Sequence, residues 1–401
     1  MADMQTGATR ERDGAAGAGR GRGRTDGGRG GRSGGGGRSI HSHPQEKRQR
    51  VHHQSSATQQ TRAFPRKWMM YEPPYHPETR VPLAPATFRV VSFNTLADYL
   101  VVKDGVLSSP QGWMYEWSYR GPRLIHEIVA WSPHIICLQE VDHFGGFFEP
   151  ELRKRGYTGI YKRRTGEETH DGCAIFVKNG AFKIVSSHPI EYHVPGHPVL
   201  DRDNIALAAV VEWQGATEDV PPQQFIVATT HVLFNPKRGD VKLAQLEMLT
   251  KTISELRVQQ QDSSSPELPV LLCGDFNLEP HSALYHFLST GSLDASGLNR
   301  TTLSGQNGFD DPASQLEFAS AYAQSPDERC TGEPKFTIFH SGSKGTVDYM
   351  WFTRASLHCH DVLEMTPAGV LFAQKALPTQ HESSDHLSLV ADFSLRSMHH
   401  Y

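Results

Sequence analysis

Eight apolar runs, rich in branched and aromatic residues, constrain the fold of this chain more than any other feature. Runs of this kind are typical of β-strands. They cover residues 88–94, 134–141, 173–178, 205–213, 224–232, 269–277, 347–353 and 386–395. Most are apolar on both faces, which predicts sheets covered on each side by another layer. The last run differs, because its leucine, alanine and phenylalanine residues alternate with serine and aspartate.

Two segments between these runs have helical spacing. Apolar residues recur at helical intervals in residues 120–133, which predicts a helix stopped by Pro133. Residues 239–257 repeat the pattern, with Asp240 as the predicted N-cap. The apolar positions are Leu124, Ile128 and Trp131 in the first segment and Leu246, Leu249, Ile253 and Leu256 in the second. Strands interleaved with helices predict an α/β fold, a four-layer sandwich of two stacked mixed β-sheets flanked by helices.

The first 62 residues differ in composition from the rest. They are rich in glycine and arginine and almost free of apolar residues, so they cannot bury enough surface to offset their ordering entropy. We therefore predict a disordered tail over residues 1–62 and a catalytic domain over residues 63–401. The tail is either a solvated extension or a weak, sequence-tolerant RNA contact through charge and arginine stacking.

Charge and cysteine usage exclude several classes of protein. A formal charge of -4 excludes a broadly basic nucleic-acid coat protein. The sequence shows neither a signal peptide nor the roughly 20 apolar residues that cross a bilayer. The five cysteines, none in a Cys-x-x-Cys motif, predict buried reduced thiols and a cytoplasmic or nuclear protein; they are Cys137, Cys173, Cys273, Cys330 and Cys359. Any metal should then be held by oxygen or nitrogen ligands.

Polar residues stand where six of the predicted strands begin or end. Taken singly, each has a structural explanation as a turn former, a cap or a satisfied histidine. In an extended strand Asp275 and Asn277 leave the same face, with Phe276 turned away. Together the set indicates a site for a cation or a phosphate; it comprises Asn94, Glu140, His231, Asn235, Asp275, Asn277, Asp348, Asp385 and His386.

Metal-assisted cleavage of a phosphate ester needs such a set. Mg²⁺ prefers carboxylate and amide oxygens and keeps several waters, so one or two carboxylates with open positions suit it. We predict Glu140 as the first ligand, with Asp385 or Asn94 assisting, and Mn²⁺ as a substitute ion. The ion would polarise the phosphoryl oxygen.

The remaining polar residues have predicted roles in moving protons and holding the phosphate. Asp275 is the predicted base for the attacking water, and Asn277 the donor to the phosphate. His386 paired with Asp348 would supply an imidazolium-like donor, with His231 as a further donor. The roles of His386 and Asp275 can be exchanged.

From residue 88 onward the chain resembles the endonuclease/exonuclease/phosphatase superfamily. Its marks all occur here in order: an Asn strand, a Gln-Glu strand, a His-x-x-x-x-Pro loop, GDFN, an Asp-Tyr strand and a terminal SDH. The branch with Angel, nocturnin and the carbon catabolite repressor type deadenylases is resembled by WSYRGPRL, CLQEVD, DGCAIFVK, HVLFNPKRGDVKLAQ and VDYMWFT. Within that branch, NPKRGDVKLAQ is most similar to Angel-like proteins. The resemblance implies a DNase I-like two-sheet sandwich, Mg²⁺ dependence and hydrolysis at single-stranded RNA 3′ ends. It also puts Asn235, Pro236 and Ser343 on the substrate side.

Two features of the full deadenylases are missing from this sequence. No repeating leucine pattern occurs upstream of Phe88, so stable membership of a large deadenylase complex is not expected. Those enzymes stack a tail base on an aromatic residue shortly before the Asp-Tyr strand, where this chain has Ser343. We therefore expect only a modest preference for adenine, unless Phe234 or Phe339 takes the stacking role.

The resemblance favours a poly(A)-specific 3′–5′ exoribonuclease that acts in mRNA decay. Two alternatives remain open: a phosphatase that clears a 2′,3′-cyclic phosphate from RNA, and a catalytically silent RNA-binding protein. Silent descendants of nuclease folds usually lose a metal ligand or the histidine. Because Glu140, Asp275, His231 and His386 are all present, the enzyme interpretation is favoured.

Overall fold

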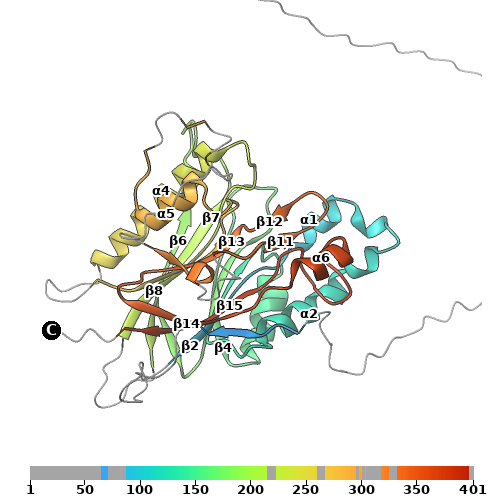
Figure 1. Cartoon of the computed structure of the whole chain (residues 1–401), viewed down its shortest axis with the longest axis horizontal. Helices are drawn as coiled ribbons and strands as arrows, with labels where there is room; N and C mark the ends of the chain where they lie inside the picture. The colour runs from blue at the N-terminus through green and yellow to red at the C-terminus, as the bar shows by residue number, and fades with distance from the viewer. Residues whose placement is uncertain are drawn as a thin grey trace, which may run out of the picture. The chain divides into compact units, whose positions relative to one another are not determined.

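The computed structural model describes residues 65–70, 87–214, 223–259, 267–294, 298–299, 303, 318–324 and 332–396. The predicted tail of residues 1–62 and Cys330 lie outside these ranges, so the domain boundary after residue 62 stays a prediction. Within the described part, two β-sheets stack face to face with helices on their outer surfaces (Figure 1). The predicted fold class is confirmed.

The first sheet consists of β1 (Trp68–Met70), β2 (Phe88–Asn94), β3 (Ile135–Gln139), β4 (Tyr157–Arg163), β5 (Gly172–Lys178), β14 (Leu357–Leu363) and β15 (Leu389–Leu395). Its strand order is β1-β14-β15-β2-β3-β5-β4. The second sheet consists of β6 (Phe182–Glu191), β7 (Ile205–Trp213), β8 (Gln223–His231), β9 (Val270–Asp275), β10 (Ala319–Ser320) and β13 (Asp348–Phe352). Its order is β10-β13-β9-β8-β7-β6, and β11 (Ile338–Phe339) forms a separate hairpin with β12 (Lys344–Gly345).

Six α-helices occur in the described ranges: α1 (Asp98–Lys103), α2 (Trp117–Val129), α3 (Glu149–Arg153), α4 (Gly239–Gln259), α5 (Ala283–Thr290) and α6 (Ala368–Gln374). Short helical turns cover Val106–Ser108, Gly112–Met114, Phe144–Phe148 and Tyr322–Gln324. Helices α2 and α3 bury their apolar residues against the first sheet, and α4 and α5 bury theirs against the second. None of the helices in the described ranges has the length and apolar character needed to cross a bilayer.

A third apolar cluster fills the space between the sheets. Phe88 on β2 stacks on Phe225 of β8 at 5.2 Å and lies 6.2 Å from Phe393 on β15. Fully burying one such side chain contributes roughly 1.5–3 kcal/mol relative to exposing it. The four described cysteines are buried free thiols on strands of both sheets, as predicted; they are Cys137, Cys173, Cys273 and Cys359.

Two details of the sequence-based prediction are wrong. Asp240 lies inside the first turn of α4 rather than at its N-cap, because the helix already begins at Gly239. Strands β4, β6 and β14 were not predicted, because they are less apolar than the others. β6 shows the reason: it ends its sheet and alternates between exposed and partly buried residues over much of its length.

Candidate active site

Strand direction brings the predicted polar residues to one end of the two sheets. β2 runs parallel to β3, and β8 runs parallel to β9, so each pair ends at a common edge. His231 ends β8 opposite Asp275, the last residue of β9. Asp348 opens the antiparallel strand β13 opposite Asp275, and His386 precedes β15. Residues far apart in the sequence therefore meet because the strands that carry them start or stop at this edge.

Asp275 lies at the centre of this group and is buried. Its Oδ2 accepts a hydrogen bond from Asn94 Nδ2 at 3.1 Å. The same oxygen lies 3.6 Å from Nε2 of His231 and 3.8 Å from Nε2 of His386. Burial, and then the neighbouring Asp348 carboxylate, raise the pKa of Asp275 to about 6. A carboxylate with this pKa is suited to accept a proton near neutral pH.

The GDFN sequence forms a tight turn rather than a continuing strand. Gly274 has a φ of 147°, and a Cβ on it would lie 2.2 Å from the carbonyl oxygen of Thr230, so only glycine fits. The strand ends at Asp275, and Asn277 adopts a left-handed φ of 50°. The prediction that Asp275 and Asn277 leave the same face of one extended strand is therefore wrong. Both side chains still line one cavity, and Phe276 is turned away from it and packs in the cluster formed with α4 and α5.

Hydrogen bonds from three sides hold the Asn277 turn. The backbone N–H of Asn277 donates to Asp275 Oδ1, and its side-chain amide donates to the carbonyl oxygen of Val232. Lys242 on α4 donates to the carbonyl oxygen of Asn277. Burial lowers the pKa of Lys242 to about 8. An asparagine amide has two N–H groups, so one remains for a ligand.

His386 and Asp348 make the predicted contact. His386 Nδ1 lies 2.8 Å from Asp348 Oδ2, and both side chains are buried. Burial alone lowers the pKa of His386, but the Asp348, Asp385 and Asp275 carboxylates outweigh it and hold that pKa well above its usual value. The raised pKa favours the protonated ring, whose Nε2 lies 3.8 Å from Asp275 Oδ2.

Glu140 follows β3 in a left-handed conformation with a φ of 55°. A non-glycine residue with this conformation is uncommon and costs free energy, which is a recurrent feature of functional sites. Its carboxylate accepts from Asn94 Nδ2 at 2.9 Å and from the backbone N–H of Ala97 at 2.9 Å. Burial, and then the Asp385 and Asp171 carboxylates, raise the pKa of Glu140.

The donor set fits a divalent cation. Ligand atoms of Glu140, His231 and Asp275 lie within 4.8 Å of one another, as do those of Asp275, Asp348 and His386. The carboxylates crowd together enough to raise pKa values, and a cation would relieve that repulsion. His231 Nδ1 is buried without a hydrogen-bond partner in the described part, and burial lowers the pKa of this ring, which favours its neutral form. Carboxylate oxygens are the ligands that Mg²⁺ and Mn²⁺ prefer. An imidazole nitrogen is a better ligand for softer ions than for either of these.

A cavity of about 280 Å³ opens over these groups. It is lined by Leu100, Glu140, Arg164, Asn204, His231, Leu233, Phe234, Asp275, Asn277, Ile338, His340, Asp385 and His386. Asn94 and Asp348 support this lining from behind through the hydrogen bonds described above. Of the three predicted substrate contacts, Asn235 and Pro236 are exposed beside the lining, and Ser343 lies at the β11–β12 turn.

Arg164 and His340 are lining residues that the sequence did not reveal. Arg164 follows β4, and its guanidinium pairs with the buried Asp171 at 3.4 Å and donates to the carbonyl oxygen of Asp203. It is a cation on the wall of a cavity rich in carboxylates. His340 follows the two-residue strand β11, which is too short to predict.

Arg120 was also missed, although it stands in the quoted WSYRGPRL run. Its side chain is fully buried and donates to the carbonyl oxygens of Thr95, Leu96, Tyr115 and Ser383. The guanidinium thus ties the loop after β2 to the loop before His386. A buried arginine on an otherwise apolar helix face was the available signal, because such a charge needs partners.

We expect Arg120→Lys to lower both stability and turnover. Lysine keeps the charge but cannot reach all four carbonyl groups, and leaving one buried acceptor unsatisfied costs about 1–3 kcal/mol. Denaturant unfolding and initial rates measure the two effects, with the exposed Arg153→Lys as control. Unchanged values for both would show that Arg120 does not position these loops.

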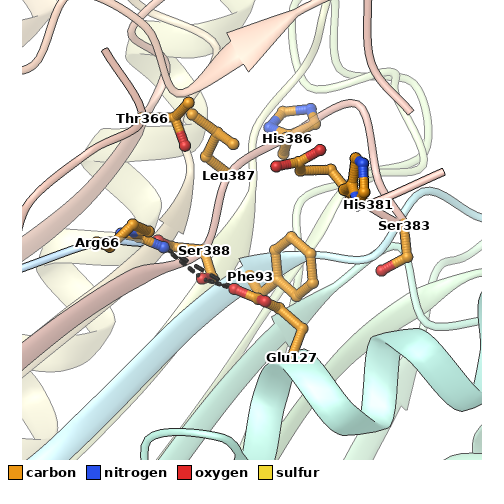
Figure 2. A pocket seen from close by; sticks show the side chains of 10 residues that line it. Arg66, Phe93, Glu127, Thr366, His381, Ser383, His386, Leu387 and Ser388 are labelled. Carbon is orange, nitrogen blue, oxygen red and sulfur yellow. Dashed lines mark hydrogen bonds and ion pairs between the residues drawn. The ribbon is translucent and has the colours of Figure 1, made fainter. Parts of the chain in front are cut away.

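A second network joins Arg66, Ser388 and Glu127 beside the small cavity that His386 also lines (Figure 2). Arg66 donates to Ser388 through Oγ at 3.0 Å and through the carbonyl oxygen at 2.8 Å, and to the carbonyl oxygen of Glu364. Ser388 in turn donates to Glu127 on α2. A cavity of about 20 Å³ separates this network from His386. Arg66, two residues before β1, therefore holds Ser388, two residues after His386, in place.

Comparison with known proteins agrees with this geometry. Residues 91–386 match the Endonuclease/Exonuclease/phosphatase family. The chain is 34% identical over 380 residues to protein angel homolog 2 of Danio rerio, covering 78% of this chain and 65% of that protein. It is 33% identical over 358 residues to carbon catabolite repressor protein 4 homolog 1 of Arabidopsis thaliana, covering 78% and 58%. The chain thus spans less than two thirds of the length of either relative.

Solved structures give the same result. The crystal structure of ANGEL2, a 2′,3′-cyclic phosphatase, in complex with adenosine-2′,3′-vanadate matches with a TM-score of 0.69 and 31% identity, covering 83% of this chain and 99% of that one. The human nocturnin catalytic domain with bound sulfate matches with a TM-score of 0.59 and 26% identity, covering 83% and 98%.

Proposed function

Because the chain belongs to the endonuclease/exonuclease/phosphatase family, in the branch of the Angel, nocturnin and carbon catabolite repressor proteins, we propose that it is a metal-dependent phosphatase of RNA 2′,3′-cyclic phosphate ends. The observation that supports hydrolysis is that Asp275, the His386–Asp348 pair and Glu140 converge at one cavity. The similarity to ANGEL2, whose structure holds a 2′,3′-vanadate, supports the cyclic end group.

The stacking position before the Asp-Tyr strand also supports the cyclic phosphate over an adenine tail. The β11–β12 turn carries Ser343 instead of an aromatic residue, and Phe339 is fully buried, so neither can stack a base. Phe234 is 58% exposed and lines the cavity, which favours the predicted deadenylase activity as the second candidate. This ranking reverses the one that the sequence alone suggested.

Glu140 would hold the divalent ion, with Asp385 or the amide oxygen of Asn94 assisting. Such an ion supplies Lewis-acid polarisation of the phosphoryl oxygen and stabilises charge on the leaving oxygen. Asp275 accepts the proton of the attacking water, for which its raised pKa suits it. The His386 imidazolium, held by Asp348, donates to a phosphoryl oxygen, and the remaining N–H of Asn277 does the same.

Removing a 2′,3′-cyclic phosphate takes two hydrolytic steps. The first water attacks phosphorus and breaks one of the two ring P–O bonds, which leaves a phosphate monoester and one free hydroxyl group. A second water breaks the remaining P–O bond and releases inorganic phosphate with a 2′,3′-diol. Each water gives its proton to the base, and each leaving oxygen takes one up.

The deciding experiment supplies one RNA sequence with different 3′ ends. The ends are a 2′,3′-cyclic phosphate, a 3′-phosphate, an A-tail and a mixed hydroxyl end, each with and without Mg²⁺. We expect Mg²⁺-dependent loss of the cyclic phosphate without shortening of the chain. Shortening of the A-tail alone would establish the deadenylase instead, and inertness on every RNA would favour the silent RNA-binding protein.

The His386–Asp348 pair allows a test of shared function. We expect His386→Ala to abolish most turnover and Asp348→Asn to act through His386, because the carboxylate holds the imidazolium. The double variant should then be no slower than the slower single variant. Fully multiplicative losses in initial rates would show that the two residues act separately.

The remaining predictions concern location and partners. We propose single-stranded RNA 3′ ends as the partner, a cytoplasmic or nuclear location, and no stable membership of a large deadenylase complex. The four buried reduced thiols support a reducing compartment.

A further inference from the structure

Helix α6 exposes an aromatic side chain beside the active site. Phe372 is 52% exposed, although its neighbours Phe336 and Phe339 are buried. Its ring lies 5.7 Å from that of Phe336 and 5.4 Å from that of Phe339, nearly perpendicular to both. Two packed rings therefore fix the orientation of the exposed one. An exposed aromatic ring held in this way loses little entropy when a flat ligand stacks on it.

Lysines lie on or near this cluster of aromatic rings. Lys344 Nζ lies 4.8 Å from the centre of the Phe339 ring and 5.9 Å from that of Phe372. Lys335 Nζ lies 5.5 Å from the Phe336 ring, and the exposed Lys375 follows the last turn of α6. One lysine against the exposed ring, a second on its packed neighbour and a third at the end of the same helix make a surface suited to an aromatic polyanion. We call Phe372, Lys335, Lys344 and Lys375 the α6 platform.

The β11–β12 hairpin lies between the platform and the active-site cavity. Ile338 and His340 line the cavity, while Phe339 between them packs against Phe372 on α6. Ile338 also forms a β-bridge to His386. Figure 1 shows β11, β12 and α6 together on one side of the molecule. An RNA strand whose 3′ end lies in the cavity can therefore pass over the β11–β12 hairpin and reach α6.

We propose that the α6 platform binds single-stranded RNA upstream of the 3′ end that occupies the active site, an inference that rests on the proposed function. A base stacks on Phe372, and the lysines neutralise the flanking phosphates. Base stacking combined with basic side chains is the usual way to hold a single strand without reading its sequence. The platform would thus select RNA over single nucleotides without selecting a base.

A protein partner fits this surface less well. Stable protein interfaces bury about 1,200–2,000 Å² and have an apolar core depleted of charge. Phe372 is the one large apolar side chain of α6 that is strongly exposed in the described structure, and lysines flank it. Charge complementarity therefore favours a nucleic acid over a protein as the ligand of the α6 platform.

Direct binding tests the platform without relying on hydrolysis. A labelled single-stranded RNA of about twelve nucleotides is titrated with the full chain in chelator, and fluorescence anisotropy gives the affinity. Stacking one base is worth about 1–3 kcal/mol, so Phe372→Ala should weaken binding roughly 5- to 150-fold. Lys344→Gln should weaken binding and reduce the dependence of log K on log salt by about 0.7. Val185→Ala and Lys183→Gln make the same kinds of change at exposed positions on β6 and should have no effect.

Kinetics provide the second arm. With Mg²⁺, Phe372→Ala should raise the KM of the RNA with a cyclic phosphate end far more than that of adenosine 2′,3′-cyclic phosphate, which is too short to reach α6. Unchanged RNA affinity in both platform variants, or equal effects on the long and short substrates, would overturn the platform. A wild-type protein that binds RNA through Phe372 but hydrolyses neither substrate would overturn the proposed function and not the platform.

Discussion

Glu140→Gln is expected to reduce hydrolysis to background while the protein stays folded. Glutamine keeps the size of the side chain and one oxygen to accept the Ala97 N–H or the Asn94 amide, but it lacks the charge that a divalent cation needs. Removal of the metal with a chelator should have the same effect on the wild-type enzyme. Initial rates with a cyclic phosphate RNA, with and without added Mg²⁺, measure both.

Stability measurements separate loss of the metal from loss of the fold. Burial and two neighbouring carboxylates raise the pKa of Glu140, so its charged form destabilises the metal-free folded state at neutral pH. In chelator, Glu140→Gln should therefore unfold at the same temperature as the wild type or a higher one. The exposed Glu255→Gln on α4 is the matched control. Undiminished hydrolysis by Glu140→Gln, or by wild type fully stripped of metal, would refute the metal mechanism.

Asp275→Asn should lower turnover by about 10²–10⁴, the usual contribution of a general base, with little change in substrate affinity. The amide cannot accept the proton of water, but its oxygen can still accept the Asn277 N–H that holds the turn. Single-turnover rates and substrate binding in chelator measure the two quantities separately. Asp201→Asn, on an exposed loop, is the control.

The same variant decides between the two possible bases. Three carboxylates outweigh burial and raise the pKa of His386, which favours the role of proton donor over that of base. If Asp275→Asn retains more than about a tenth of wild-type turnover, Asp275 is not the base. A ten-fold loss corresponds to only about 1.4 kcal/mol, which is less than the usual contribution of a general base. The base role would then pass to His386, with Asp275 holding its position.

The sequence predicted the strands that carry the candidate active-site residues. An apolar run that stops at a polar residue marks the end of a buried strand, and neighbouring strands that run in parallel end at one edge. Asn94, Glu140, His231 and Asp275 were found by this rule, and Asp348 and His386 by its counterpart at the start of antiparallel strands. The long helices were predicted for a similar reason, because their periodic apolar residues pack on the sheets.

Only the tertiary structure decided how these residues face one another. The left-handed turns at Glu140 and Asn277 depend on hydrogen bonds from residues distant in sequence, such as Lys242, which no local pattern encodes. The buried Arg120 links two loops that are distant in the sequence, one at Thr95 and the other at Ser383. Long-range packing sets burial and charge proximity, and with them the pKa values of Asp275 and His386. The exposure of Phe372 beside the cavity likewise follows from how α6 packs on β11, which sequence periodicity over so short a helix cannot reveal.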